Sequence, residues 1–154
     1  MLKDQQVLKH LQELHQIHLV GGDTVSTPGP LTLTITAFGL IDEGKSFQRN
    51  TANIGDNLYV TGNIGDSALG LRIAKNEVHY ELSPKSKARL IERYRSPTPR
   101  VEIGMLLPGY ATSAIDISDG LLADVGHIAK ESGVQIRIRA QRVPVSEIAQ
   151  RLLR

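Results

Sequence analysis

The sequence of 154 residues contains no cysteine. This absence excludes disulfide bonds, cysteine-ligated zinc and catalysis by a thiol, and it fits a reducing compartment. Aromatic residues make up only 4% of the sequence, and the formal net charge is +2, from 18 basic and 16 acidic residues. Nucleic-acid binding usually needs a strong positive charge and aromatic side chains that stack on bases. We therefore expect no nucleic-acid partner.

Long apolar runs are also lacking. No run approaches the roughly 20 residues that a helix needs to cross a bilayer. The N-terminal segment is rich in lysine and glutamine and has no apolar core of the kind found in signal peptides. These features predict a cytoplasmic protein without a membrane partner. The 40% of hydrophobic residues is enough for one domain with a core, or for two small ones.

Alternating and helical patterns both occur along the chain, which predicts a mixed α+β fold. Between residues 31 and 41, aliphatic residues alternate with threonines, as in a strand with one buried face. Shorter strands are expected at 57–61 and 134–138. The expected helices are 2–17, a short one around Leu69, one opened by Ser83 and Pro84, 101–107, about 118–132, and a C-terminal segment around Ile148.

A proline-rich segment interrupts this series. Pro97 and Pro99 deny a helical conformation to the residues before them and stiffen the connection. We place a domain boundary there, which gives domains 1–96 and 97–154.

The segment 114–121 combines a short apolar run with two aspartates three positions apart. We expect a buried strand that ends at Asp116 and a helix that begins at about Ser118, with Ser118 as its N-cap and Asp119 in its first turn. Small ligands gather at such strand-to-helix turns, and a carboxylate pair beside unpaired N–H groups can hold a hard cation against a phosphate. The alternative is that Asp119 only caps the helix and Asp116 lies on a solvated turn.

Two further segments are candidates for ligand contact. Gly21 and Gly22 precede Asp23, and glycines there permit positive φ angles and close approach of a ligand to the backbone. The alternative is a plain glycine-rich turn. Arg49 is a candidate for a phosphate contact because its guanidinium matches phosphate geometry, although a lone arginine is more often a surface residue. The arginines late in the chain are expected to form a solvated face: Arg137, Arg139, Arg142, Arg151 and Arg154.

Several short motifs occur in an order that is more specific than any one of them. They are Val20-Gly21-Gly22-Asp23-Thr24, Gly44-Lys45 with Arg49, Ile54-Gly55-Asp56, Leu58-Tyr59-Val60-Thr61-Gly62, Gly65-Asp66-Ser67-Ala68-Leu69-Gly70-Leu71, Pro97-Thr98-Pro99-Arg100 and Ala114-Ile115-Asp116-Ile117-Ser118-Asp119-Gly120-Leu121. From about residue 5 onward, this series resembles the thiamine-monophosphate kinase family of the AIR-synthase-related superfamily.

The resemblance implies a partial two-domain AIR-synthase-like fold with mixed and antiparallel sheets flanked by helices. Residues 1–96 would be the C-terminal part of the family's N-terminal domain, and residues 97–154 would begin its C-terminal domain. Family members are homodimers that pair the sheets of their N-terminal domains. A homodimer partner is therefore expected here.

The resemblance also implies ATP-dependent phosphorylation of thiamine monophosphate to thiamine diphosphate, with Mg²⁺ as cofactor. Such a transfer needs cations that neutralise charge and align the reactants, and no covalent catalyst from the protein. Carried over to this sequence, the magnesium ligands would be Asp23, Asp116 and Asp119. The nucleotide contacts would be Gly22, Asp23, Arg49 and Ser118, with Arg49 on the ATP phosphates.

The family's N-terminal acidic cluster and its C-terminal part have no counterpart in this sequence. We therefore expect a truncated chain with impaired activity on its own. Two alternatives stay open. One is another ATP-dependent member of the superfamily, such as selenophosphate synthetase or the hydrogenase-maturation dehydratase. The other is a non-catalytic remnant that binds nucleotide or dimerises.

Overall fold

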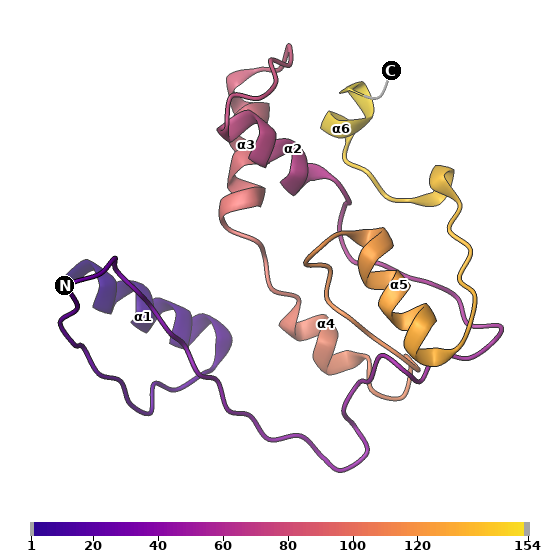
Figure 1. The fold of residues 1–154 in the computed structure, drawn as a ribbon, viewed down its shortest axis with the longest axis horizontal. Coiled ribbons are helices and arrows are strands. Elements are labelled where there is room, and N and C mark those ends of the chain that lie inside the picture. The colour runs from indigo at the N-terminus through magenta and orange to yellow at the C-terminus, as the bar shows by residue number, and fades with distance from the viewer. Residues whose placement is uncertain (1, 153–154) are drawn as a thin grey trace. The chain divides into compact units, whose positions relative to one another are not determined.

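The computed structural model describes residues 2–152, with side chains from residue 6 onward. The chain forms two compact units, Met1–Ile41 and Asp42–Arg154. Their regular elements are all helical (Figure 1). In chain order they are α1 (Leu2–His15), α2 (Asp66–Ala74), α3 (Pro84–Arg95), α4 (Val101–Leu106), α5 (Leu121–Ser132), the 3₁₀ helix η1 (Ala140–Arg142) and α6 (Glu147–Leu152).

The first unit consists of helix α1 and a long extended segment. The helix predicted for residues 2–17 is confirmed, but it ends at His15 because Gln16 has a positive φ of 52°. The Ile17 amide then donates a hydrogen bond to the Gln12 carbonyl oxygen at 3.1 Å. Along the apolar stripe of α1, Val7 is 57% exposed and Leu14 61% exposed. Within this unit the stripe therefore covers no core.

The prediction of a mixed α+β fold with sheets is wrong, because residues 2–152 contain no strand and no sheet. The segment 31–41 is extended, but Leu31, Leu33 and Ile35 are all more than 80% exposed. A strand exists only through the ladder of hydrogen bonds with its neighbour. The alternation of residue types specifies which face of a strand is apolar, whereas the hydrogen-bonding partner must come from another segment.

Two other segments that were predicted to be strands, 57–61 and 134–138, are also not strands in the structure. Residues 134, 136 and 138 are half-buried and alternate with exposed residues, as in a strand that lies on a helix. Residues 57–61 are also extended. Both segments line one cavity, and among the described residues no backbone hydrogen bond joins them. They therefore lack the ladder that defines a pair of strands.

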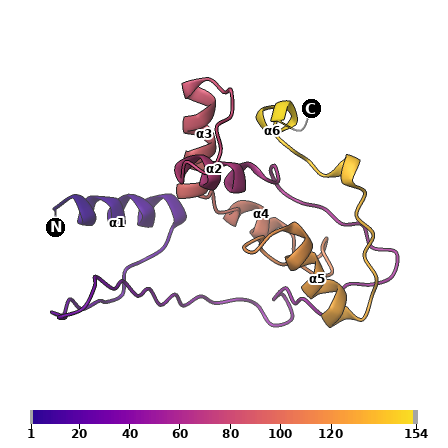
Figure 2. The same ribbon diagram turned by 45° about the horizontal axis from the view of Figure 1, so that its top comes forward.

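Helices α2 and α3 form the tightest contact in the second unit, and they lie against each other in both views (Figure 2). Leu90 of α3 is fully buried. Gly70 of α2 faces the Leu90 backbone with no room for a side chain. The predicted N-terminus of α3 is confirmed: Pro84 is the first helical residue, and the Ser83 hydroxyl accepts a hydrogen bond from the Ser86 amide at 3.2 Å.

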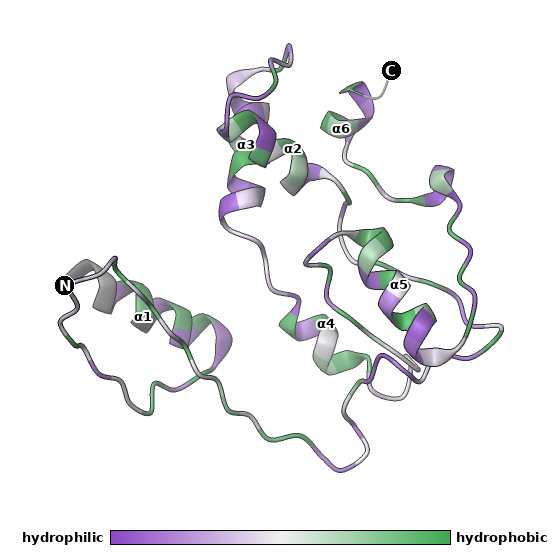
Figure 3. Cartoon of the chain, in the orientation of Figure 1, coloured by the Kyte–Doolittle hydropathy of each residue, from purple (hydrophilic) through white to green (hydrophobic). Residues whose placement is uncertain are grey.

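Helix α5 carries strongly apolar and strongly polar residues side by side (Figure 3). Val125 and Ile128 are buried, which gives the helix a packed face. Its predicted C-terminus is confirmed by Gly133, which adopts the left-handed conformation with φ 64°. The predicted N-terminus at Ser118 is wrong. The helix begins at Leu121, and Gly120 is its N-cap.

Helix α6 is joined to α2 by buried polar groups. The Ser146 hydroxyl donates a hydrogen bond to the Asp66 carboxylate at 2.6 Å and accepts one from the Ala149 amide at 3.1 Å. Asp66 and Ser146 are both buried. A backbone hydrogen bond from Ile64 to Pro144 runs beside them. The C-terminal segment therefore packs on the N-terminal end of α2.

The fold does not test two expectations from the sequence, the domain boundary and the cytoplasmic location. The domain boundary predicted between residues 96 and 97 lies within the second unit, and the division into 1–96 and 97–154 stays a prediction. In the part of the chain that the structure describes, no helix has both the length and the apolar character to cross a membrane. The expected cytoplasmic location also stays a prediction.

Candidate functional site

The loop 116–120, which leads into α5, carries three of the predicted site residues. It is held by one carboxylate oxygen of Asp124. That oxygen accepts hydrogen bonds from the amides of Ser118 at 3.1 Å, Asp119 at 3.3 Å and Gly120 at 3.1 Å. Asp124 is only 3% exposed. Gly120 has a φ of 126°, which favours glycine and turns the chain into the helix.

This arrangement corrects the local prediction in two ways. Ser118 does not cap the helix, and the Asp124 side chain instead holds the loop before it, including the amide of the N-cap residue Gly120. Asp119 lies before the helix and not in its first turn. The amides of Ser118, Asp119 and Gly120, which the sequence placed at the start of the helix, precede it and are bonded to Asp124. The Asp116 and Asp119 carboxylates are therefore exposed to solvent, whereas the amides of Ser118 to Gly120 are hydrogen-bonded within the chain.

Asp116 and Asp119 are both exposed. Neither side chain forms a hydrogen bond or ion pair with another residue in the range 6–152. Their oxygens are thus available to a hard cation, and carboxylate oxygen is the donor that Mg²⁺ prefers. In the described residues, no three acidic or histidine side chains gather into a ready metal site. The pair fits a cation that other ligands, such as phosphate oxygens or water, would complete.

Arg49 lies at the other end of α5. Its carbonyl oxygen accepts a hydrogen bond from the Ser132 hydroxyl at 2.9 Å, and the same hydroxyl accepts one from the Ala52 amide at 3.2 Å. Ser132 is the last residue of a 12-residue helix, so roughly 18 Å of helix separates it from Gly120. The preceding residue, Gln48, lies beside the segment that leads to Asp116, because its carbonyl oxygen accepts hydrogen bonds from the Ser113 hydroxyl at 2.7 Å and from the Ala114 amide at 3.4 Å. The Arg49 side chain is exposed, and its contact with phosphate stays a prediction.

Gly22 and Asp23 belong to the first unit. The Asp23 carboxylate accepts a hydrogen bond from the Thr24 amide at 2.8 Å, which fixes a local turn. Neither Gly21 nor Gly22 has a positive φ, but a side chain at either would meet nothing within 4 Å. The backbone is therefore open to approach, as expected from the glycines. The roles of Gly22 in nucleotide binding and of Asp23 in nucleotide and magnesium binding stay predictions.

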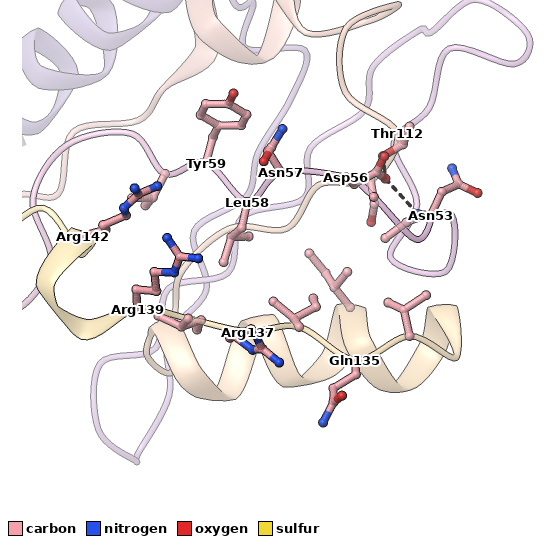
Figure 4. A pocket seen from close by; sticks show the side chains of 18 of the residues that line it. Asn53, Asp56, Asn57, Leu58, Tyr59, Thr112, Gln135, Arg137, Arg139 and Arg142 are labelled. Carbon is pink, nitrogen blue, oxygen red and sulfur yellow. Dashed lines mark hydrogen bonds between the residues drawn. The ribbon is translucent and has the colours of Figure 1, made fainter.

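The sequence did not predict a cavity in the second unit, which has a volume of about 510 Å³. It lies between residues 52–60 and 134–144 and is lined by Leu121 and Ile128 of α5. Leu58 and Tyr59 point in opposite directions from one of its walls (Figure 4). Three of the late arginines line the cavity and are exposed, as expected of a solvated face: Arg137, Arg139 and Arg142. None of the predicted site residues lines it.

Asp56 lies at one end of this cavity and anchors the turn that precedes it. One carboxylate oxygen accepts hydrogen bonds from the Thr112 hydroxyl at 2.6 Å and from the Asn53 amide at 2.8 Å (Figure 4). These bonds favour the charged form, so the Thr112 hydroxyl and then the Asn53 amide lower the Asp56 pKa below 3.8. In the sequence, the hydrogen bonds of Asp56 were indicated only by its position directly after Gly55 in a turn.

Comparison with known proteins gives the family context. No family model matches the sequence. The thiamine-monophosphate kinase of Salmonella typhimurium is 42% identical over 142 residues, and that of Escherichia coli K12 is 41% identical over 141 residues. Each alignment covers 92% of this chain and 42% of the relative. The Caulobacter vibrioides enzyme is 43% identical over 137 residues, which cover 89% of this chain and 38% of the relative.

Solved structures agree with the sequence comparison. The crystal structure of thiamine-monophosphate kinase from Stenotrophomonas maltophilia matches with a TM-score of 0.67 and 36% identity, over 73% of this chain and 36% of that one. AaThiL complexed with AMPPCP and TMP matches with a TM-score of 0.62 and 37% identity, over 68% of this chain and 33% of that one. This chain spans about two fifths of the length of the curated relatives that it matches. Over about nine tenths of its own length, the chain is a homologue of the thiamine-monophosphate kinases.

Proposed function

We propose that this chain takes part in the ATP-dependent phosphorylation of thiamine monophosphate. The terminal phosphoryl group of ATP would pass to the phosphate oxygen of thiamine monophosphate, giving thiamine diphosphate and ADP. The observation that carries the proposal is the exposed Asp116 and Asp119 pair, held by Asp124, in a chain 42% identical to a thiamine-monophosphate kinase. A relative complexed with AMPPCP and TMP supports the same pair of substrates.

The residues present fit Mg²⁺ as the cofactor. Asp116 and Asp119 would hold Mg²⁺, and Asp23 would also ligate magnesium, since carboxylates suit hard cations. Bound there, Mg²⁺ would neutralise the charge that develops on the transferred phosphoryl group. Ser118 and Gly22 would contact the nucleotide. The Arg49 guanidinium would bind the ATP phosphates through paired N–H donors.

We also propose that the chain forms a homodimer. The exposed leucines and isoleucine of residues 31–41 provide an apolar surface that monomeric proteins rarely leave open to water. In a dimer, these residues would gain the neighbour that they lack within the first unit. Light scattering coupled to gel filtration tests this directly, with a dimer mass expected at micromolar concentration. A monomer mass at every concentration up to the solubility limit would contradict it.

Calorimetric titration with AMPPCP, in the presence and absence of Mg²⁺, tests the proposed site. We expect binding that depends on Mg²⁺ and that falls at least tenfold in Asp116→Asn and Asp119→Asn. Asp42→Asn is the matched control because Asp42 is also an exposed aspartate on a turn of the same unit. Equal binding by the native chain and both site variants would remove the two aspartates from the site.

A separate assay tests the chemistry. The native chain is incubated with ATP, Mg²⁺ and thiamine monophosphate, and thiamine diphosphate is quantified by chromatography. Product above that formed by Asp116→Asn supports phosphoryl transfer by this chain. Binding of AMPPCP without any product would contradict catalysis and favour a nucleotide-binding role.

A further inference from the structure

Asp124 carries a buried carboxylate, and the sequence did not predict a role for it. The structure places one of its oxygens at the centre of three consecutive amides, those of Ser118, Asp119 and Gly120. With 3% of its surface exposed, the side chain has little access to water. A buried charge requires such donors, so Asp124 and the loop hold each other in place.

The three bonds fix the backbone from Ser118 to Gly120, which contains one candidate metal ligand and closely follows the other. Asp119 lies within the bonded segment, and Asp116 is two residues before it. Once the amides are fixed, the φ and ψ angles of the loop are restricted, and so are the directions in which both carboxylates leave the backbone. A cation held by two side chains depends on that geometry, and groups that support metal ligands typically change metal affinity 10- to 100-fold.

We propose that Asp124 is a positioning residue that sets the geometry of the Asp116 and Asp119 carboxylates for a divalent cation. This inference rests on the proposed function. Asp124 would act through the loop, without contacting the cation or the nucleotide itself.

The same contacts have an electrostatic consequence. Free amides at a helix N-terminus attract phosphate directly. Here the three amides that immediately precede α5 are bonded to the Asp124 carboxylate, and Asp116 and Asp119 add two more carboxylates to the same loop. The loop therefore repels a bare anion and accepts one only through a cation. We expect AMPPCP to bind the chain with Mg²⁺ but not with excess EDTA, and inorganic phosphate alone not to perturb the Ser118–Gly120 amides.

A helix cap without any role in the site is the alternative, and variants separate the two. Asp124→Asn keeps the shape and one acceptor oxygen of the side chain but removes its charge. Ser83→Ala is the matched control because it removes the side-chain cap of α3, whose hydroxyl bonds the Ser86 amide. Both variants weaken a helix N-terminus, and only Asp124 supports the loop 116–120.

The experiment measures the Mg²⁺ concentration at which AMPPCP binding is half-maximal, with the folded fraction of each variant checked by circular dichroism. We expect that concentration to rise tenfold or more in Asp124→Asn and to change less than twofold in Ser83→Ala. An unchanged value in folded Asp124→Asn, with a raised value in Asp116→Asn, would overturn this inference and leave the proposed function standing. Unchanged values in both would overturn the proposed function as well.

A measurement on the native chain covers the case in which Asp124→Asn does not fold. Amide hydrogen exchange of Ser118, Asp119 and Gly120 is followed without Mg²⁺ or nucleotide. We expect exchange at least tenfold slower than for the exposed Gly21 and Gly22, because only the former amides are bonded to a buried carboxylate. Exchange at the rate of Gly21 would overturn the inference.

Discussion

The Leu90 carbonyl oxygen occupies the space into which any side chain at Gly70 would extend. A Cβ built on Gly70 would overlap that oxygen and lie 3.1 Å from the Ile91 amide nitrogen. Gly70 and Leu90 are both buried, and Leu90 is completely shielded from water. The contact between α2 and α3 therefore depends on the absence of a side chain at Gly70.

Gly70→Ala should destabilise the second unit by about 1–3 kcal/mol or more, the usual range for overpacking. The obstacle is backbone and cannot rotate away, so the two helices must separate and expose Leu90. Urea unfolding followed by circular dichroism measures the change in the free energy of unfolding.

Gly126→Ala provides the matched control. Gly126 lies inside α5, is exposed, and has nothing within 4 Å of a Cβ. Alanine there should stabilise the chain by about 0.5–1 kcal/mol because it restricts the unfolded backbone. If both alanine variants shift the free energy of unfolding in the same direction, a side chain at Gly70 does not clash with the Leu90 backbone.

The Asp56 carboxyl should titrate below 3.8, because the Thr112 hydroxyl and the Asn53 amide stabilise its charged form. The unfolded chain then binds a proton more readily than the folded one. The stability from Asp56 is complete above pH 3.8 and is lost as the pH falls through the lower pKa of the folded state. Carbon NMR of the Asp56 carboxyl during an acid titration measures the pKa.

Thr112→Val should move the Asp56 pKa upward toward 3.8 by removing the hydroxyl that contributes most to the shift. Thr51→Val is the control because the Thr51 hydroxyl donates to the Thr112 carbonyl oxygen and not to a carboxylate. An Asp56 pKa that is the same in the native chain and in Thr112→Val would contradict the hydrogen bond.

Ser146→Ala should cost about 1–3 kcal/mol, because it removes the hydroxyl donor of the buried Asp66 carboxylate and the acceptor of the Ala149 amide. Ser83→Ala removes a cap from an exposed helix end and should cost about 1 kcal/mol. Thermal unfolding of the two variants gives the comparison. A loss in Ser146→Ala no greater than in Ser83→Ala would show that Asp66 does not need its partner.

The helices could be predicted from sequence because their signals are local. Ser83 and Pro84 start α3, and Gly133 ends α5, through contacts within one turn of the helix. The strands could not be predicted in the same way. The alternation at residues 31–41 is clear, but a ladder needs a partner segment that no local pattern specifies.

Only part of the local structure around the candidate site could be predicted, and the roles of its residues stay predictions. The spacing of Asp116 and Asp119 indicated an acidic turn before a helix, whereas the N-cap was assigned to Ser118 and is Gly120. The Asp124 side chain reaches back across the first turn to the loop amides, as acidic residues early in a helix can do. An aspartate four positions after Gly120 was the available signal.

The most direct test is whether Asp116 and Asp119 bind a divalent cation together with a nucleotide. Mn²⁺ prefers the same oxygen ligands as Mg²⁺, and its unpaired electrons broaden NMR signals of nearby nuclei. The amide spectrum is recorded with AMPPCP and Mg²⁺, and then with substoichiometric Mn²⁺. We predict broadening of the amides around Asp116 and Asp119, with the amide of Asn76 unaffected. Unbroadened amides at both aspartates would contradict the proposed site.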